Sequence, residues 1–374
     1  MIPGPTNVDP LVLRALSRPT LAHTDPQFIE TFEDTLENLK KIFVTKGDVF
    51  AVAGSGTLAL EIGLANIIEP GDKVLNVVIG YFGDYFVKMS KAHGGVPSVL
   101  DIPWGRCAKV DQIQEALEKE DYKAVTITHV DTSTGAVNPV KEIGQIVHQR
   151  SDAFYIVDTV CSLGGIEVRA DDWYIDACLS GSQKCLGVPP GLALISVNDR
   201  VLNLLEKRKT AVSFWYGDLK NWLPIMKNPS KYFATPPVNM IYSLSESLKA
   251  ILAEGLETRF RRHHIMAQAF RSGLESLKVK LVADLACAAD TLTVAYYPDG
   301  IEDLAFRNGM RQCGIVVAST IGSIRGKGFR VGHMGNVNQN DIMSTMGSIE
   351  VTLKRLNYRF NDGAGLAAAQ QKLL

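Results

Sequence analysis

A regular alternation of short apolar runs and longer amphipathic stretches constrains the fold of this chain more than any other feature. The apolar runs, which predict strands, lie at residues 50–53, 73–79, 98–102, 124–129, 154–158 and 175–179. Stretches with helical spacing of their apolar residues lie between them, at 56–68, 82–92, 110–117 and 140–149. Strands that alternate with helices are typical of a parallel sheet, because each parallel connection crosses over through a helix. We therefore predict an α/β fold with a mainly parallel, doubly wound sheet and helices on both of its faces.

The second half of the sequence has a different texture. After one more predicted strand at 192–197 and a helix at 201–208, the chain enters an aromatic loop region within residues 214–237. Long helices are expected within 238–276, and the last part predicts shorter elements: strands at 291–296, 315–318 and 329–332, and helices at 301–313 and 339–356. We therefore predict two domains, an N-terminal arm with a large cofactor-binding domain over residues 1–250 and a smaller α+β domain over residues 251–374.

The two ends of the chain lack this pattern. The first residues are rich in proline and glycine and predict an extended arm, which leads to a helix at residues 26–43. The tail from about residue 361 is rich in glycine and alanine without periodicity, so we expect it to be flexible.

The charge balance bears on the kind of partner. With 39 Lys and Arg against 40 Asp and Glu, the formal net charge is −1, and there is no polybasic block. This composition argues against nucleic-acid and membrane-surface roles, so we expect small-molecule partners. The N-terminus has no signal-peptide pattern, and no window is apolar enough for a membrane span. The six cysteines include no Cys-x-x-Cys pair, which favours a reducing cytoplasm over a metal site or a disulfide framework.

A lysine follows the strand predicted at 175–179, within the run SGSQKCLGVPPG (residues 180–191). The turn expected at its Pro-Pro-Gly end places Lys184 near a strand end, where open α/β sheets bind ligands. A lysine that is partly desolvated among small groups can form a Schiff base. A surface lysine on a loop is the alternative interpretation.

Two further features are expected at the same edge of the sheet. Asp158 ends a buried strand, so it either faces a cation or caps the next helix. The loop AGSGT (residues 53–57) joins a strand to a helix and is either an anion site for a phosphate or a plain turn. Together with Lys184, these features fit pyridoxal 5'-phosphate, whose pyridinium nitrogen is a cation that a carboxylate keeps protonated.

Three motifs carry a resemblance to a known family. The runs SGSQKCL (180–186) with PPG (189–191), VDTVCSLGG (157–165) and TSTG (132–135) resemble the class V aminotransferases of fold type I, which depend on pyridoxal phosphate. Within this family the chain is most similar to the alanine–glyoxylate and serine–pyruvate branch. The resemblance extends from GPTN (4–7) to RVGHMG (330–335), which is nearly the whole chain.

The resemblance implies roles for individual residues. Lys184 would be the Schiff-base lysine and the proton carrier, with Asp158 as the second catalytic residue. Arg330 would bind the substrate carboxylate through its bidentate fork, unless it forms a buried structural ion pair. The residues that the resemblance assigns to cofactor binding are Ser55, Gly56, Thr57, Phe82, Ser133, Asp158, Val160, Gln183, Lys184, Tyr232 and Thr235.

Some of these assignments carry a further implication or an alternative. Phe82 would stack on the cofactor ring, although its neighbour Tyr81 is an alternative for that role. Tyr232 and Thr235 would reach the phosphate of a neighbouring subunit, which implies a homodimer with shared active sites, or they would simply form an aromatic rim.

The expected activity is a ping-pong transamination, in which serine or alanine gives its amino group and glyoxylate or pyruvate receives it. Related transaminases that act on ureidoglycine or pyridoxamine are the nearest alternatives. A cysteine desulfurase or lyase is a weaker one, because Cys287 and Cys313 do not lie in a Gly/Ser-rich loop and Gln183 replaces the histidine that such enzymes favour before the lysine. A scaffold without turnover is also disfavoured, because every matching catalytic position is filled.

Overall fold

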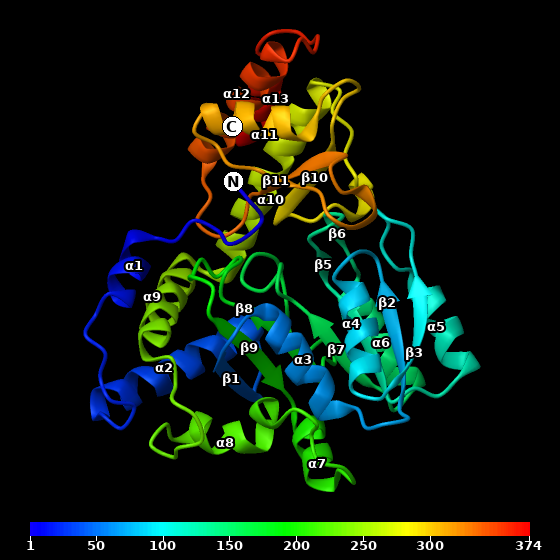
Figure 1. Cartoon of the computed structure of the whole chain (residues 1–374), viewed down its shortest axis with the longest axis vertical. Coiled ribbons are helices and arrows are strands. Elements are labelled where there is room, and N and C mark those ends of the chain that lie inside the picture. Colours follow the sequence, from blue (N-terminus) through cyan, green and yellow to red (C-terminus); the bar gives the residue numbers. More distant parts are fainter.

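A seven-stranded sheet forms the centre of the larger part of the molecule (Figure 1). The structure is a computed structural model that describes residues 1–374. The strand order is β1-β9-β8-β7-β4-β2-β3, and only β9 runs antiparallel to its neighbours. The strands are β1 (Asp48–Ala53), β2 (Lys73–Val78), β3 (Val96–Asp101), β4 (Ala124–Thr128), β7 (Phe154–Asp158), β8 (Ala177–Gly181) and β9 (Leu192–Val197). The predicted mainly parallel, doubly wound sheet is confirmed.

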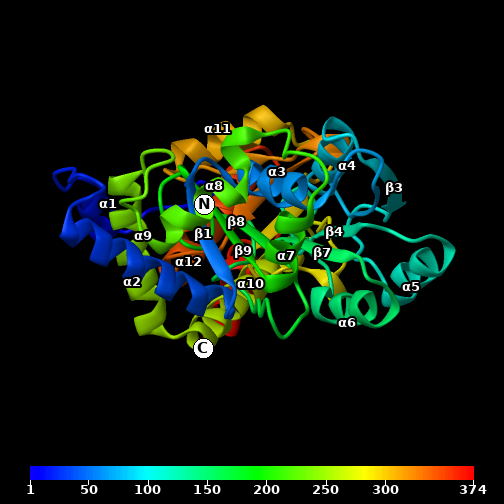
Figure 2. The ribbon, with the colours of Figure 1, turned by 90° about the horizontal axis from the view of Figure 1, so that it is seen from below.

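Helices cover both faces of this sheet. In Figure 2, α3 (Gly56–Ile67) and α4 (Gly83–Ala92) lie on one side, and α5 (Val110–Lys119) and α6 (Val140–Arg150) lie on the other. Because both faces are covered, β7 and β8 are buried along their whole length and read as continuous apolar runs rather than as an alternation. A short hairpin of β5 (Val130–Asp131) and β6 (Ala136–Val137) follows β4 at the edge where the parallel strands end.

The N-terminal helix α2 (Pro26–Phe43) packs on β1 and on α9 (Val238–Glu254). Asp25 caps α2 by accepting from the Gln27 N–H, and Pro26 occupies its first turn. Helix α7 (Asp199–Lys207) packs on β9. One continuous apolar core of 68 buried residues joins these elements.

The last third of the chain builds a second, smaller layer. An antiparallel sheet in the order β10-β12-β11 packs with α10 (Leu256–Ser276), α11 (Asp303–Gln312), α12 (Gln339–Arg355) and α13 (Ala364–Leu373) around a core of 18 buried residues. Its strands are β10 (Leu292–Tyr296), β11 (Ala318–Ser319) and β12 (Gly328–Gly332). The first residue of the chain also joins this layer, because the Gly332 N–H donates to the Met1 carbonyl.

Three helices occur where none was expected. The arm contains α1 (Pro10–Leu16), which Asp9 caps, and the aromatic region contains α8 (Leu219–Lys227), which Asp218 caps. The tail forms α13, whose start is fixed because the Glu350 carboxylate accepts three backbone N–H groups, those of Gly363, Gly365 and Leu366. The expectation of a flexible tail was therefore wrong. The tail is helical because its first N–H groups are bound by a buried carboxylate on α12, which the local sequence of the tail does not reveal. No helix has both the length and the apolarity to cross a membrane.

Candidate active site

A cavity of about 240 Å³ opens at the carboxyl ends of β7 and β8, against the start of α3 and the N-terminal arm. Parallel strands place their carboxyl ends at one edge of the sheet, so side chains that are far apart in sequence converge there. The predicted site residues that line this cavity are Gly56, Thr57, Phe82, Asp158, Val160, Gln183 and Lys184. The strand ends therefore bring the predicted lysine, carboxylate and phosphate loop together.

Lys184 lies on the turn between β8 and β9, half-buried at the cavity wall. Its Nζ donates to the Pro3 carbonyl of the N-terminal arm. The arm comes this close because Gly4 has φ of +102° and no side chain, and a Cβ there would lie 2.4 Å from Lys184 Cδ. The Lys184 carbonyl is held in turn by the Thr6 hydroxyl at 2.9 Å. The arm is thus part of the site, which the sequence pattern did not indicate.

Asp158 is the last residue of β7 and is almost completely buried. Its Oδ1 accepts a hydrogen bond of 2.8 Å from the Val160 N–H, and no salt bridge neutralises the carboxylate. Burial raises the pKa of Asp158 to about 7, with a smaller contribution from the nearby Asp131 charge. A buried carboxylate without a salt-bridge partner can bind a positively charged group of a ligand that enters the cavity.

The start of α3 has uncapped backbone N–H groups at the cavity. Its N-cap, Ser55, makes no side-chain capping bond, so the first N–H groups of the helix remain available to a ligand. The cavity is lined there by Gly56 and Thr57, whereas Ser55 is exposed beside it. The Gln183 amide lies at the same cavity, and its buried Oε1 has no hydrogen-bond partner.

Phe82 and Val160 line the cavity, whereas Tyr81 does not. Phe82 is placed by a carboxylate that sequence reasoning missed. Asp131, fully buried in the β5–β6 hairpin, accepts from the Phe82 N–H at 3.0 Å and from the Ser133 hydroxyl at 2.6 Å. Its position two residues after the strand predicted at 124–129 was the only available signal.

Arg330 projects from β12 beside this hairpin. Its Nε donates to the Ser319 carbonyl at 2.8 Å and its Nη1 to the Thr132 carbonyl at 3.4 Å. It forms no salt bridge, so the alternative of a structural ion pair does not apply. Partial burial lowers the pKa of Arg330, but an arginine stays protonated in proteins, so this partly buried cation has no salt-bridge partner.

Other predicted residues lie outside the cavity. Ser133 is completely buried, and its hydroxyl donates to Asp131. Thr132 and Cys161 line the cavity instead, and their side chains hydrogen-bond to each other. Tyr232 and Thr235 are exposed at the surface and do not contribute to the cavity of their own chain.

These residues fit pyridoxal phosphate. The buried Asp158 lacks a cation, the start of α3 offers N–H groups to a phosphate, and Lys184 and the aromatic Phe82 line the space between them. Each chemical part of the cofactor therefore has a matching group in the cavity.

Comparison with known proteins gives the same result. The family model described as aminotransferase class-V matches residues 14–325. The chain is 43% identical to an uncharacterized aminotransferase of Methanocaldococcus jannaschii, with 100% of this chain and 97% of that protein covered. It is 36% identical to alanine–glyoxylate aminotransferase 1 of Saccharomyces cerevisiae over 90% of this chain and 91% of the yeast protein. The crystal structure of ureidoglycine–glyoxylate aminotransferase from Bacillus subtilis superimposes with a TM-score of 0.96 at 34% identity, covering 100% of this chain and 97% of that one.

Proposed function

The chain belongs to the class V aminotransferases, with pyridoxal phosphate as cofactor, and from this premise we propose that it moves the amino group of serine or alanine to glyoxylate or pyruvate. The observation that carries the proposal is the meeting of Lys184, Asp158 and the start of α3 in one cavity. A ping-pong reaction follows, because one site binds the amino acid and the 2-oxo acid in turn.

The cofactor, when bound, supplies an electron sink that weakens the bonds at the α-carbon of the amino acid. Asp158 holds a proton on the ring nitrogen, because a cation against its carboxylate offsets the burial that raises its pKa. Lys184 takes and returns the substrate proton at Nζ, for which its place at the cavity wall is suited. Phe82 and Val160 supply apolar walls for the ring.

Arg330 holds the substrate carboxylate, because its partly buried guanidinium forms no salt bridge and can offer a bidentate fork. Lys184 is the only basic side chain that lines the cavity itself. Arg330 does not line the cavity but reaches its rim at the Thr132 carbonyl. No further basic side chain lines the cavity to pair with a side-chain carboxylate, which favours small neutral donors over aspartate or glutamate.

The nearest alternative is another amino donor, ureidoglycine or pyridoxamine. The structure of the Bacillus subtilis ureidoglycine–glyoxylate enzyme supports this candidate. A desulfurase remains disfavoured, because Cys287 is buried and Cys313 ends α11 rather than lying in an exposed glycine-rich loop.

We also propose a homodimer in the cytoplasm. Tyr232 and Thr235 are exposed on a segment that carries a second large exposed aromatic, Trp215. If a second copy covers these side chains as the family resemblance implies, Tyr232 and Thr235 would lie at the partner's cavity and complete its phosphate site.

The test is the visible absorbance of the purified protein, recorded before and after addition of L-serine, L-alanine, L-glutamate, ureidoglycine or pyridoxamine. A cofactor band that bleaches with serine or alanine and returns with glyoxylate or pyruvate would support the proposal. Bleaching by ureidoglycine or pyridoxamine alone would favour the alternative donors. A protein that stays colourless after incubation with pyridoxal phosphate would overturn the proposed activity.

A further inference from the structure

We infer that Arg259 and Arg262, two arginines in the first turns of α10, are positioning residues that fix the Lys184 loop and the end of the Arg330 strand relative to each other. The inference rests on the proposed function, because it concerns the distance between the proton carrier and the carboxylate holder. Neither arginine lines the cavity, so each would act through the backbone that it holds.

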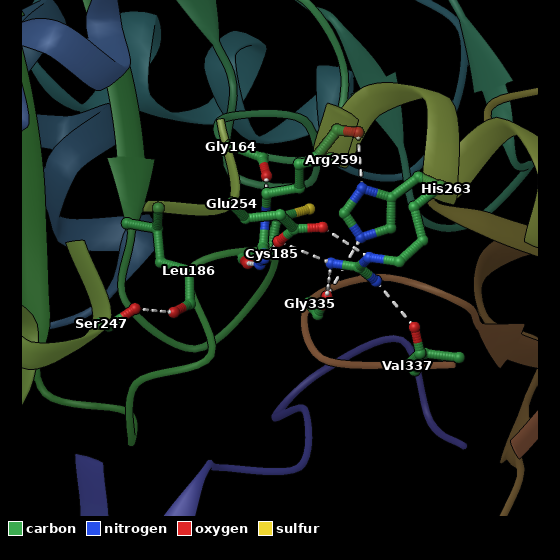
Figure 3. A network of polar contacts seen from close by, with 11 residues as sticks. Gly164, Cys185, Leu186, Ser247, Glu254, Arg259, His263, Gly335 and Val337 are labelled. Carbon is green, nitrogen blue, oxygen red and sulfur yellow. Dashed lines mark hydrogen bonds and ion pairs between the residues drawn. The ribbon is translucent and has the colours of Figure 1, made fainter. Parts of the chain in front are cut away.

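Arg259 holds the large-domain side of the site (Figure 3). Its Nη2 donates to the Cys185 carbonyl at 2.7 Å, and its Nε donates to the Gly164 carbonyl at 2.8 Å. Cys185 is the residue after Lys184, and Gly164 lies in the segment that follows Asp158. One rigid, planar guanidinium therefore ties the lysine loop to the loop that leaves β7.

Arg262 holds the other side of the site. Its Nη1 donates to the Val337 carbonyl at 2.7 Å, and its Nη2 donates to the Gly335 carbonyl at 3.1 Å. These carbonyls belong to the loop that leaves β12 directly after Arg330 and Gly332. Both arginines project from α10. The two loops are therefore held in fixed positions relative to the same helix and to each other.

Glu254, at the end of α9, pairs with the buried Arg259 and the partly buried Arg262 (Figure 3). It accepts from Arg259 Nη1 at 2.7 Å and from Arg262 Nε at 2.6 Å. Burial by itself would raise the pKa of Glu254, but the hydrogen bonds from Arg262 and Arg259 lower it, so the carboxylate stays charged. A buried guanidinium without such a partner would be strongly destabilising, so the three side chains form one unit.

His263 adds a neutral contact between the same loops. Its Nδ1 lies 2.8 Å from the Gly165 carbonyl and its Nε2 lies 3.2 Å from the Gly335 carbonyl. Burial, followed by the charges of Arg259 and Arg262, lowers the pKa of His263 to about 3, so the imidazole is neutral and donates from only one nitrogen. Arg262 already donates to the Gly335 carbonyl, so the Gly165 carbonyl is the acceptor left for the imidazole, and His263 adds fewer hydrogen bonds than either arginine.

The test compares three substitutions on α10 in the cofactor-loaded enzyme: Arg259→Gln, Arg262→Gln and the control Arg261→Gln. Arg261 is exposed and forms no salt bridge. We expect Arg259→Gln to lower kcat by about 10- to 100-fold, because Lys184 loses its register. Arg262→Gln should instead raise KM for the amino acid by about 10-fold, because Arg330 shifts. Arg261→Gln should change neither constant.

A second readout does not depend on turnover. The pH dependence of the absorbance of the bound cofactor reports the surroundings of Lys184, so it should change in Arg259→Gln and stay as in the wild type in Arg262→Gln. A purely structural role would lower Tm in both variants while leaving kcat, KM and the absorbance profile unaltered at a temperature well below Tm. That result, or equal changes of kcat and KM in both variants, would overturn the inference.

Two further comparisons keep the outcome decisive. If Arg259→Gln does not fold, Arg259→Lys replaces it: the charge is kept and the fork is lost, so a smaller fall in kcat is expected and an unchanged kcat counts against the inference. A wild-type protein without bound cofactor would instead contradict the proposed function. The two failures are therefore distinguished by the wild-type spectrum.

Discussion

Asp158 is the residue whose charge depends most on what the cavity contains. Burial raises its pKa to about 7, against an ordinary value of 3.8, and only Lys184 opposes this with a nearby positive charge. In the protein without cofactor, the unfolded state therefore releases the Asp158 proton at a lower pH than the folded state does. It follows that this residue makes the cofactor-free protein less stable as the pH rises from about 4 to about 7.

We predict that Asp158→Asn raises Tm of the cofactor-free protein at pH 8, because the buried charge is removed. The gain is at most about 4 kcal/mol, and it should disappear toward pH 4, where the wild-type carboxyl is protonated in both states. The same substitution should slow transamination severely, because an amide cannot keep the ring nitrogen protonated. Thermal melts across this pH range and single-turnover kinetics measure the two effects. A Tm difference that does not vary with pH would contradict the assigned titration.

Arg330 carries a second prediction at the residue scale. Arg330→Lys should raise KM for the amino acid by about 10- to 100-fold, because a point charge replaces a bidentate fork. Arg325→Lys, three residues before β12 and exposed, is the matched control and should leave KM unchanged. Steady-state kinetics with serine and alanine measure KM in both variants. An unaltered KM in Arg330→Lys would show that Arg330 does not bind the substrate carboxylate.

At the scale of elements, the β5–β6 hairpin fixes where α4 begins. Asp131 accepts from the Phe82 and Gly83 N–H groups at the start of α4, and from both the backbone and the hydroxyl of Ser133. Burial raises the pKa of Asp131, and these hydrogen bonds oppose the rise. The hairpin and the helix are thus joined at the place where Phe82 enters the cavity.

We predict that Asp131→Ala destabilises the protein by about 2–4 kcal/mol, because several buried donors lose their acceptor. It should also weaken cofactor binding, because Phe82 is no longer held. Asp84→Ala is the control on the same helix, since Asp84 is exposed and pairs only with Lys88. Denaturant unfolding gives the first effect and a titration with pyridoxal phosphate the second. If both variants bind the cofactor as the wild type does, Asp131 does not position Phe82.

At the scale of the whole molecule, the proposed dimer makes a prediction that no single chain can test. Lys184→Ala and a Tyr232→Ala variant should both be inactive, because each lacks one part of the site. A mixed dimer would contain one site in which both residues are intact. After random reassembly, about a quarter of wild-type activity should therefore return.

The control for this experiment is a mixture of Lys184→Ala with Asp158→Asn. Both substitutions affect the same subunit's own site, so no mixed dimer contains an intact site and no activity should return. Recovery in the first mixture and not in the second would establish shared sites. Failure in both, with subunit exchange demonstrated by mass spectrometry, would place Tyr232 outside the partner's site.

The sequence by itself determined the order of strands and helices in the large domain and the residues at the strand ends. Periodicity and turn residues are local signals, so β9 matches its predicted bounds of 192–197 and α2 its predicted bounds of 26–43. The same local logic could have found α1 and α8, because Asp9 before Pro10 and the N-cap Asp218 are readable start signals. The three motifs at residues 132–135, 157–165 and 180–191 indicated the family, and Lys184, Asp158 and the loop at 53–57 together indicated its cofactor.

Only the tertiary structure decided how these strand ends are held. Asp131 contacts Phe82 across 49 residues, and Arg259 contacts the Gly164 carbonyl across 95 residues. Helix α13 is ordered by Glu350, and the cavity wall is completed by Gly4 of the arm. Local sequence preferences cannot predict such contacts. Each hydrogen bond forms only after two segments that are distant in the sequence have packed against each other.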